Sequence, residues 1–344
     1  MADQKITTKL TLLAKQMVAP GKGILAADES IATIDKRFAP ISLANTEENR
    51  RAFRTMLLTT KDMGRYISGV ILFDETIRQK ADNGKRFVEI LEAAGVLPGI
   101  KVDEGLFPMP SSPTEKLTKG LDTLDARLQE YAQLGATFCK WRSVITVSEK
   151  TPTDANIQQN AHDLASYASI CQKNGLVPMV EPEVLMEGSH TRLQSREASR
   201  KILTALFTEL EKQNVSCEGL ILKTSMVVSG KDSGELETPN DVARETVALF
   251  KEVLPNTLPG EAFLSGGQSE LQATANLNAM HQLGTLPWPL TFSFARALQD
   301  SATKTWAGKA ENVAAAQKVF LHRAKMNSLA SQGAYTPDME KELS

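Results

Sequence analysis

The sequence contains little cysteine and little histidine. Its 344 residues include three cysteines, Cys139, Cys171 and Cys217, and four histidines. The cysteines are few, odd in number and far apart, which predicts reduced thiols in a reducing compartment. No histidine lies close enough in sequence to activate a cysteine or to complete a recognisable metal-ligand spacing. Carboxylates remain as alternative metal ligands, but we expect neither a metal nor another cofactor.

Long apolar runs and a strong charge of one sign are also missing. No run approaches the roughly 20 residues that cross a bilayer, and no apolar signal-peptide core follows the first five residues. A net charge of −2 argues against a general nucleic-acid surface and is compatible with a local basic pocket for a phosphorylated ligand. We therefore expect a cytoplasmic protein without nucleic-acid or membrane partners, or a protein of the plastid stroma if a transit peptide has been removed.

Eight short apolar runs recur along the chain, with helical patterns between them. The runs cover residues 23–30, 70–75, 99–103, 138–144, 176–184, 220–226, 262–267 and 290–296. Helices are expected after Asn45–Glu48 and Thr238–Pro239, where capping residues begin amphipathic stretches, and over 156–171, 268–282 and 310–331.

Strands that alternate with helices favour the α/β class and, within it, a (β/α)8 TIM barrel. We expect one barrel domain over residues 1–344, with an N-terminal helical extension over 1–22 and a C-terminal tail over 334–344. The alternative is an open doubly wound sheet. That fold usually places a glycine-rich phosphate loop after its first strand, and no G-x-G-x-x-G pattern follows residues 23–30.

Polar side chains occupy alternate positions near the carboxyl ends of the predicted strands. Alternate residues of a strand face the same side. The set comprises Asp28, Lys101, Asp103, Lys140, Arg142, Glu181, Glu183, Lys223, Ser225, Thr291 and Ser293. Because the interior of a barrel is normally apolar and its active site opens at the carboxyl ends of the strands, we expect these groups to converge at one mouth. The alternative is that each strand end simply leaves the core and becomes solvated.

Lys223 is the candidate nucleophile. It ends the otherwise apolar run Leu220–Lys223, and lysine is seldom buried without a partner or a function. An ordinary lysine, with a pKa of about 10.4, is a poor nucleophile at neutral pH. Burial and nearby cations such as Lys101 and Lys140 favour the neutral amine, which attacks carbonyls to form an imine. The alternative is a structural salt bridge with a neighbouring acid.

Three acidic residues are candidates for proton transfer. Glu181 and Glu183 lie two positions apart on one strand and therefore face the same side. Their environments would give them unequal proton affinities, which suits general acid and base roles. Alternatively, the two glutamates serve as counter-ions of the lysines, and both roles could hold together. Asp28 is either a proton-transfer group or the partner that orients Lys140.

Two groups of residues are candidates for anion binding. The turn Ser265–Gly267 joins the seventh strand to a helix, and bare glycine amides at a helix N-terminus suit a phosphate. Barrels often bind phosphate between the loops after strands seven and eight, where Ser293 and Arg296 also lie. Lys36 and Arg37 form a second basic group. The alternative interpretation is that they belong to a solvated helix face. Two anion sites around a reactive lysine predict a lyase or isomerase acting on a phosphorylated carbonyl compound.

These residues give the chain a close resemblance to class I fructose-bisphosphate aldolase over nearly its whole length. The matching stretches include Ala19–Ser30, Gly99–Asp103, Lys140–Arg142, Val180–Glu183, Leu264–Gln268 and Arg296–Gln299. The resemblance implies a glycolytic, metal-independent lyase on a TIM barrel. Such an enzyme reversibly cleaves fructose 1,6-bisphosphate into dihydroxyacetone phosphate and glyceraldehyde 3-phosphate through a lysine Schiff base. The common assembly of the family implies a homo-oligomer, specifically a tetramer.

The resemblance also implies roles for individual residues. Lys223 is similar in position to the Schiff-base lysine and Glu181 to the general acid/base, with Asp28, Lys140 and Glu183 assisting. The implied site of the ketose-end phosphate comprises Ser265, Gly266, Gly267, Ser293 and Arg296. The implied contacts at the other end of the substrate are Lys36, Arg37, Lys101, Arg142, Ser30 and Thr33.

Some positions depart from the family pattern, and some questions stay open. Ala295 stands where many members have glycine, and Thr33 stands where serine is common. Many members end in a tail with a terminal tyrosine, whereas the last tyrosine here is Tyr335, so the tail has been removed or this branch lacks it. A phosphosugar isomerase and a non-catalytic protein with the same fold are the competing functions. The sequence does not separate fructose from sedoheptulose bisphosphate as the preferred substrate.

Overall fold

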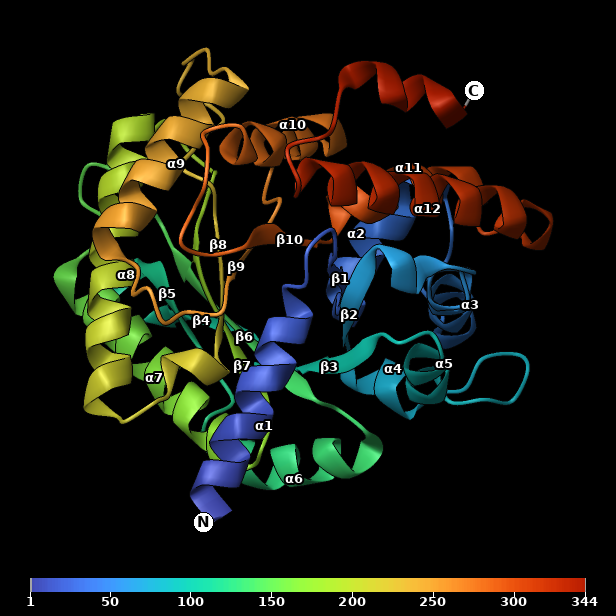
Figure 1. Cartoon of the computed structure of the whole chain (residues 1–344), viewed down its shortest axis with the longest axis horizontal. Helices are drawn as coiled ribbons and strands as arrows, with labels where there is room; N and C mark the ends of the chain where they lie inside the picture. Colours follow the sequence, from blue (N-terminus) through green and yellow to red (C-terminus); the bar gives the residue numbers. More distant parts are fainter. Residues whose placement is uncertain (1, 344) are drawn as a thin grey trace.

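The computed structural model describes residues 2–343, which fold around a closed barrel of eight parallel strands (Figure 1). Around the barrel the strands are β1 (Gly23–Ala27), β2 (Ile67–Leu72), β3 (Leu97–Lys101), β6 (Phe138–Ile145), β7 (Val177–Val184), β8 (Ile221–Thr224), β9 (Glu261–Phe263) and β10 (Leu290–Phe294), which pairs again with β1. Each predicted apolar run contributes one strand. The prediction of a (β/α)8 barrel is confirmed, and the open doubly wound sheet is wrong.

Helices surround this barrel and connect its strands (Figure 1). They are α2 (Ile31–Phe38), α3 (Glu47–Leu58), α4 (Asp74–Arg78), α5 (Phe87–Ala93), α6 (Leu124–Leu134), α7 (Asp154–Lys173), α8 (Arg192–Lys212), α9 (Pro239–Val253), α10 (Glu270–His281), α11 (Arg296–Trp306) and α12 (Val313–Ala330). Short 3-10 turns follow at η1 (Ala39–Ile41), η2 (Met63–Arg65), η3 (Cys217–Gly219), η4 (Ala310–Asn312) and η5 (Pro337–Leu343). The two predicted caps are present, because Thr46 accepts a hydrogen bond from the backbone of Asn49 and Thr238 accepts one from that of Asp241.

One pair of strands interrupts the predicted alternation of strands and helices. The strands β4 (Leu106–Met109) and β5 (Ser112–Thr118) form an antiparallel hairpin between β3 and α6. The hairpin is held by polar contacts from α7, where Asn156 and Asn160 donate to the Lys116 carbonyl at 3.1 and 3.3 Å. Its strands lack a clear apolar alternation, so the residues themselves do not signal it; contacts with a distant helix stabilise it instead.

An apolar layer fills the amino-terminal half of the barrel. It comprises Ile24, Ala26, Ile71, Phe138, Val177, Met179, Ile221 and Ala262, together with Leu10, Ala14 and Met17 of α1 (Ala2–Met17), which packs against this end of the barrel (Figure 1). Phe138 is the largest of the barrel residues, and its ring takes the space left by two glycines. A Cβ atom at Gly99 would lie 2.2 Å from the ring, and one at Gly69 would lie 3.1 Å from it. This layer forces the polar groups to the opposite, carboxyl-terminal end.

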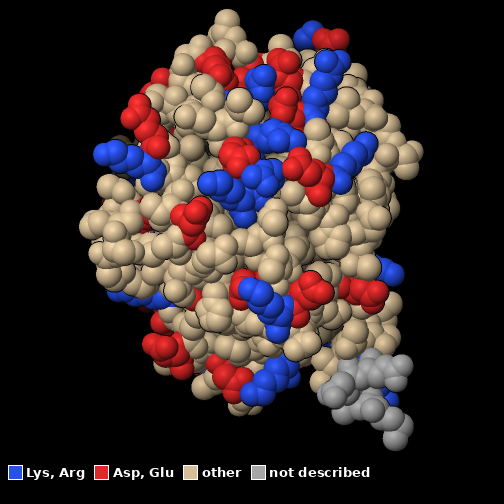
Figure 2. All heavy atoms as spheres, turned by 90° about the vertical axis from the view of Figure 1, so that its left-hand side faces the viewer, with Lys and Arg blue, Asp and Glu red and all other residues tan. Residues whose placement is uncertain are grey.

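The outer face that carries α8 and α9 has scattered charges of both signs among uncharged residues (Figure 2). Arg196 of α8 pairs with Glu245 and Glu252 of α9 at 3.3 and 2.8 Å, and Arg200 pairs with Glu197 on the same helix. This face therefore presents no extended field of one sign. Within residues 2–343, no helix combines the length and the apolar character that crossing a membrane requires.

The close approach of Phe138 to β3 leads to a stability prediction. Gly99→Ala should lower the free energy of unfolding by about 1–3 kcal/mol, because the added methyl group overlaps a ring that has no free space to move into. Gly69→Ala is the matched control, since its methyl group would meet the same ring at 3.1 Å and should cost less. Urea denaturation of both variants measures the difference. Equal losses in the two variants would contradict this account of the barrel interior.

Candidate active site

The carboxyl ends of the strands surround a cavity of about 430 Å³ at the barrel mouth. Its lining comprises Ala26, Asp28, Glu29, Ser30, Thr33, Lys36, Arg37, Lys101, Lys140, Arg142, Glu181, Glu183, Lys223, Leu264, Ser265, Gly266, Ser293, Ala295 and Arg296. All the predicted site residues except Gly267 belong to this lining. Of the polar strand-end residues expected to converge, Asp28, Lys101, Lys140, Arg142, Glu181, Glu183, Lys223 and Ser293 line this cavity. The expectation is wrong for the other three: Asp103 pairs with Lys101 outside the lining, Ser225 donates a hydrogen bond to the Val184 carbonyl, and Thr291 donates one to the Lys22 carbonyl.

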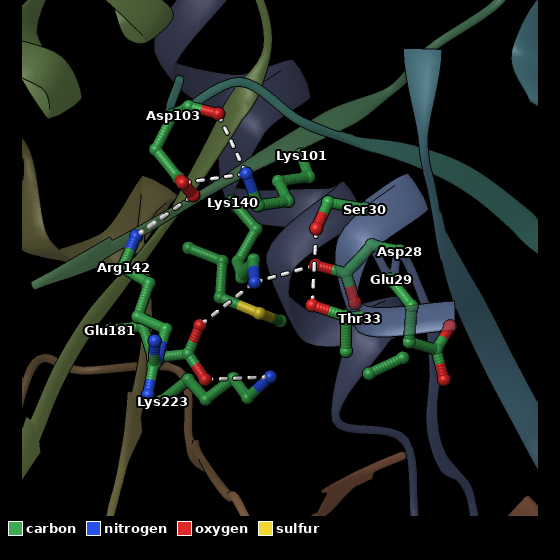
Figure 3. Close-up of polar contacts among 12 residues, drawn as sticks. Asp28, Glu29, Ser30, Thr33, Lys101, Asp103, Lys140, Arg142, Glu181 and Lys223 are labelled. Carbon is green, nitrogen blue, oxygen red and sulfur yellow. Dashed lines mark hydrogen bonds and ion pairs between the residues drawn. The ribbon is translucent and has the colours of Figure 1, made fainter. Parts of the chain in front are cut away.

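Four buried side chains form a continuous line of alternating charges at the base of this cavity (Figure 3). The Lys223 ammonium nitrogen lies 2.9 Å from one carboxylate oxygen of Glu181. The other oxygen of Glu181 lies 3.1 Å from the Lys140 nitrogen, which in turn lies 2.6 Å from Asp28. The four side chains are at most 9% exposed. Glu181 is therefore shared by two lysines that have almost no access to water.

The parallel register explains why these groups meet. Lys101 of β3 and Lys140 of β6 are register partners, and the next inward residue of β6, Arg142, is level with Glu181 of β7. Glu181 thus stands one inward position closer to the mouth than Lys140, and a lysine side chain is long enough to span that step. The two oxygens of one carboxylate can then serve lysines from β6 and β8.

Electrostatics fix the protonation states of three members of this line. Burial alone would raise the pKa of Asp28, but the charges of Lys140 and Lys223 outweigh it and lower the pKa to about 2. The pKa of Glu181 is likewise lowered by Lys140, Lys223 and Arg142, against the effect of burial. Burial alone would lower the pKa of Lys140, but the neighbouring carboxylates raise it. At neutral pH both acids are ionised and Lys140 is charged. The ionised Asp28 lies 2.6 Å from the Lys140 nitrogen, as the second of its two predicted roles, orienting Lys140, would require.

A second cluster of charges lies on the β3 and β6 side of the mouth (Figure 3). Lys101 pairs with Asp103 at 2.6 Å, and Arg142 forms a close ion pair with Glu183. Burial alone would lower the pKa of Arg142, but Glu183 and other acids raise it, so the guanidinium stays charged. Together with Ser30 and Thr33, Lys101 and Arg142 also line an adjoining hollow of about 660 Å³. Lys101, Arg142, Ser30 and Thr33 form a basic and hydroxyl-bearing wall, and the resemblance implies all four as contacts at one end of the substrate.

Arg37, which the resemblance groups with the residues of this wall, lies on another side of the mouth. Its neighbour Phe38 packs against Trp306 of α11, with ring centroids 6.1 Å apart. Burial raises the pKa of Asp300 on α11, and the charges of Arg37 and Arg296 oppose that rise. Arg37 is therefore on the β10 side of the mouth, near Arg296. The helix α2 follows β1, which lies between β10 and β2 in the closed barrel, so the end of α2 can pack towards β10 and α11.

The candidate phosphate site combines a glycine turn with the start of a helix. Ser265 and Gly266 line the cavity beside Ser293 of the neighbouring strand β10, and the buried Ser293 hydroxyl has no hydrogen-bond partner within residues 2–343. Of the two helices that follow β9 and β10, α11 is the one whose N-terminus lines the cavity, and no side chain caps it. The sequence favoured the N-terminus of α10, but Ser269 caps that helix by accepting a hydrogen bond from the Gln272 backbone. Free amides at a helix start and an unpartnered hydroxyl suit an anion.

Gly267 lies outside the cavity lining and shapes the turn instead. Its φ is +81°, and a Cβ atom there would lie 2.7 Å from the Met186 sulfur and 2.9 Å from Lys231. Both the backbone conformation and the close packing therefore require glycine at this position. The prediction that Gly267 contacts phosphate receives no support from its position.

Two residues near the mouth were missed by sequence reasoning. Glu29 lines the cavity although its strand parity, opposite to that of Asp28, suggested an outward direction. Arg54 of α3 lies behind it, 2.8 Å from its carboxylate and only 2% exposed. Arg54 sits 25 positions away in an arginine-rich helix, so no local pattern marks it. The described residues also contain no group of three His, Cys, Asp or Glu side chains arranged to hold a metal ion.

Comparison with known proteins identifies the family. The family model for class I fructose-bisphosphate aldolase matches residues 9–344. A protein of Xanthomonas axonopodis pv. citri named "Probable fructose-bisphosphate aldolase class 1" is 54% identical, covering 95% of this chain and 98% of its own. The cytosolic fructose-bisphosphate aldolase 5 of Arabidopsis thaliana is 51% identical, covering 96% of this chain and 93% of its own.

A solved structure agrees with the sequence comparison. The fructose-bisphosphate aldolase of Plasmodium falciparum superposes with a TM-score of 0.95 at 47% identity, covering 96% of each chain. Both alternatives from the sequence, an isomerase and a non-catalytic protein, are thereby wrong. The chain belongs to the class I fructose-bisphosphate aldolases, the metal-independent lyases that cleave fructose 1,6-bisphosphate into two triose phosphates.

Proposed function

We propose that Lys223 forms the imine with the C2 carbonyl of fructose 1,6-bisphosphate, and that Glu181 transfers the protons of the reaction. One observation carries this assignment. The Glu181 carboxylate touches both Lys223 and Lys140 inside a buried cavity, and it is ionised at neutral pH. An ionised carboxylate at 2.9 Å from an ammonium group is placed to accept its proton, which leaves the neutral amine that attack on a carbonyl requires.

In imine formation, Glu181 returns to the substrate the proton that it takes from Lys223. The Lys223 amine adds to C2, and a proton moves from nitrogen to oxygen to give the carbinolamine. Glu181, now a carboxylic acid, returns its proton to the C2 hydroxyl, which leaves as water. The product is a protonated imine and an ionised Glu181, so the carboxylate is ready to act again. Splitting the reaction into covalent steps lowers the individual barriers.

Carbon–carbon cleavage uses the same carboxylate as a base. Glu181 takes the proton of the C4 hydroxyl, the C3–C4 bond breaks, and its electrons pass to the protonated imine to give an enamine. The charged Lys140, held by Asp28 at 2.6 Å, stabilises the negative charge that develops on the C4 oxygen. Glyceraldehyde 3-phosphate leaves, C3 of the enamine is protonated, and water releases dihydroxyacetone phosphate.

The two phosphates are assigned to the two sides of the mouth. We place the ketose-end phosphate on Ser265 and Gly266, the α11 N-terminus, Arg296 and Arg37, because the free amides and the two guanidinium groups suit an anion. The wall formed by Ser30, Thr33, Lys101 and Arg142 suits the other phosphate. Lys223 lines the cavity with both groups of residues, as a substrate anchored at both ends requires.

Replacing the proposed nucleophile should separate binding from chemistry. Lys223→Met should lower kcat by roughly 10³-fold or more, since no other group provides the imine. Binding of fructose 1,6-bisphosphate, measured by calorimetry, should persist because both phosphate sites remain. Lys212→Met removes an exposed lysine of α8 and serves as the control with normal turnover. Substantial cleavage by folded Lys223→Met would rule out the assignment.

Replacing the proposed acid/base should slow the chemical steps. Glu181→Gln keeps the shape of the side chain but cannot accept a proton, so kcat should fall by about 10²–10⁴-fold. The matched control is Glu187→Gln, a glutamate on the following loop whose side chain is 68% exposed. Stopped-flow cleavage assays should show near-normal rates for this control. If Glu181→Gln retained the wild-type kcat, another group would have to carry the protons.

A further inference from the structure

Arg54 is a buried cation that does not itself line the substrate cavity. It projects from α3, lies 2.8 Å from one oxygen of Glu29, and stacks its guanidinium 5.3 Å from the centre of the Phe53 ring. Neither the reaction steps nor the two phosphate sites involve it. Glu29, in contrast, lines the cavity. Arg54 therefore holds its positive charge directly behind an acid that faces the phosphate-binding region.

The second oxygen of Glu29 faces Arg37. The distance to the Arg37 Nε atom is 3.7 Å, which is too long for a hydrogen bond. The two atoms of this contact are buried and, within residues 2–343, neither has a hydrogen-bond partner. Glu29 is thus bound tightly by Arg54 and only loosely by Arg37, so the Arg37 guanidinium at the mouth is left free to bind an anion.

We propose that Arg54 is a positioning residue for phosphate binding: by neutralising Glu29, it keeps Arg37 available to the substrate. This inference rests on the proposed placement of phosphate at the barrel mouth. A phosphate near Arg37 would otherwise face the bare carboxylate of Glu29. Phe53 of α3 packs against Phe38 of α2, with 5.6 Å between the ring centroids. Because Arg54 and Arg37 are the sequence neighbours of these two rings, the contact holds both arginines on either side of Glu29.

Loss of the Arg54 charge would have two effects, and both would weaken phosphate binding. The uncompensated Glu29 carboxylate would repel a phosphate, and because the Glu29 side chain is buried, this repulsion is screened less than it would be in water. It would also attract Arg37 into a closer ion pair and withdraw it from the cavity. Both effects weaken phosphate binding, and neither involves Lys223 or Glu181.

The test compares four variants of the full-length protein, with inorganic phosphate as the probe. Arg54→Gln should raise the inhibition constant of phosphate and the KM for fructose 1,6-bisphosphate about tenfold, the effect of one partly screened charge. Its kcat should change by less than about threefold, because a site saturated with substrate overcomes a binding defect. The double variant Arg54→Gln/Glu29→Gln removes both charges and should recover most of the phosphate affinity.

Two further variants separate positioning from stability. Arg50→Gln removes an arginine of the same helix whose partner, Glu75, lies outside the cavity, and it should leave phosphate inhibition unchanged. Arg54→Lys keeps the charge and should keep the inhibition constant within about threefold of wild type, since charge and not shape carries the effect.

The proposal is overturned if folded Arg54→Gln binds phosphate as wild type does, or if the double variant binds no better than the single one. Should Arg54→Gln fail to fold, a folded Arg54→Lys variant with lost phosphate affinity contradicts it equally. These outcomes are distinct from a failure of the proposed function, which would appear as turnover without Lys223.

Discussion

The Glu181 carboxylate between Lys223 and Lys140 is the interaction on which the rest of this active site depends. A lysine buried without a partner is costly, and breaking a buried ion pair typically costs about 3–5 kcal/mol. Because two lysines share one carboxylate, both amines are held at the mouth and a single acid is in position to exchange protons with either of them. The same contact that stabilises the two buried lysines therefore prepares the site for chemistry, since a proton leaving Lys223 has its acceptor in place.

Charge balance extends this principle across the whole mouth. Four cations, Lys101, Lys140, Arg142 and Lys223, stand among four carboxylates, Asp28, Asp103, Glu181 and Glu183. The groups proposed for the ketose-end phosphate are of a different kind: the amides at the start of α11, the Ser293 hydroxyl and the arginines 37 and 296. The mouth thus combines cations that are paired with acids, among them Lys101 and Arg142 of the wall proposed for the other phosphate, with amide, hydroxyl and arginine donors on the β10 side.

Sequence reasoning reached the barrel and most of the site because both follow from short-range patterns. A lysine at the end of Leu220–Lys223 and acids at alternate positions of one strand stand out locally. The hairpin β4–β5 was missed because contacts with α7 hold it. Arg54 was missed because its proposed role depends on its contact with Glu29, and only folding brings the two side chains to within 2.8 Å of each other. The choice between the N-termini of α10 and α11 likewise depended on a side-chain cap that the sequence pattern did not resolve.

The most direct measurement is a crystal structure of the protein after borohydride reduction in the presence of dihydroxyacetone phosphate. Reduction fixes the imine as a stable amine, so the attacking nitrogen becomes visible. The account predicts a covalent bond between the Lys223 nitrogen and C2 of the triose, with Glu181 hydrogen-bonded to that nitrogen and the phosphate on the Ser265–Gly266 turn. An adduct on Lys140 or Lys101, or a Glu181 carboxylate turned away from the bond, would contradict it.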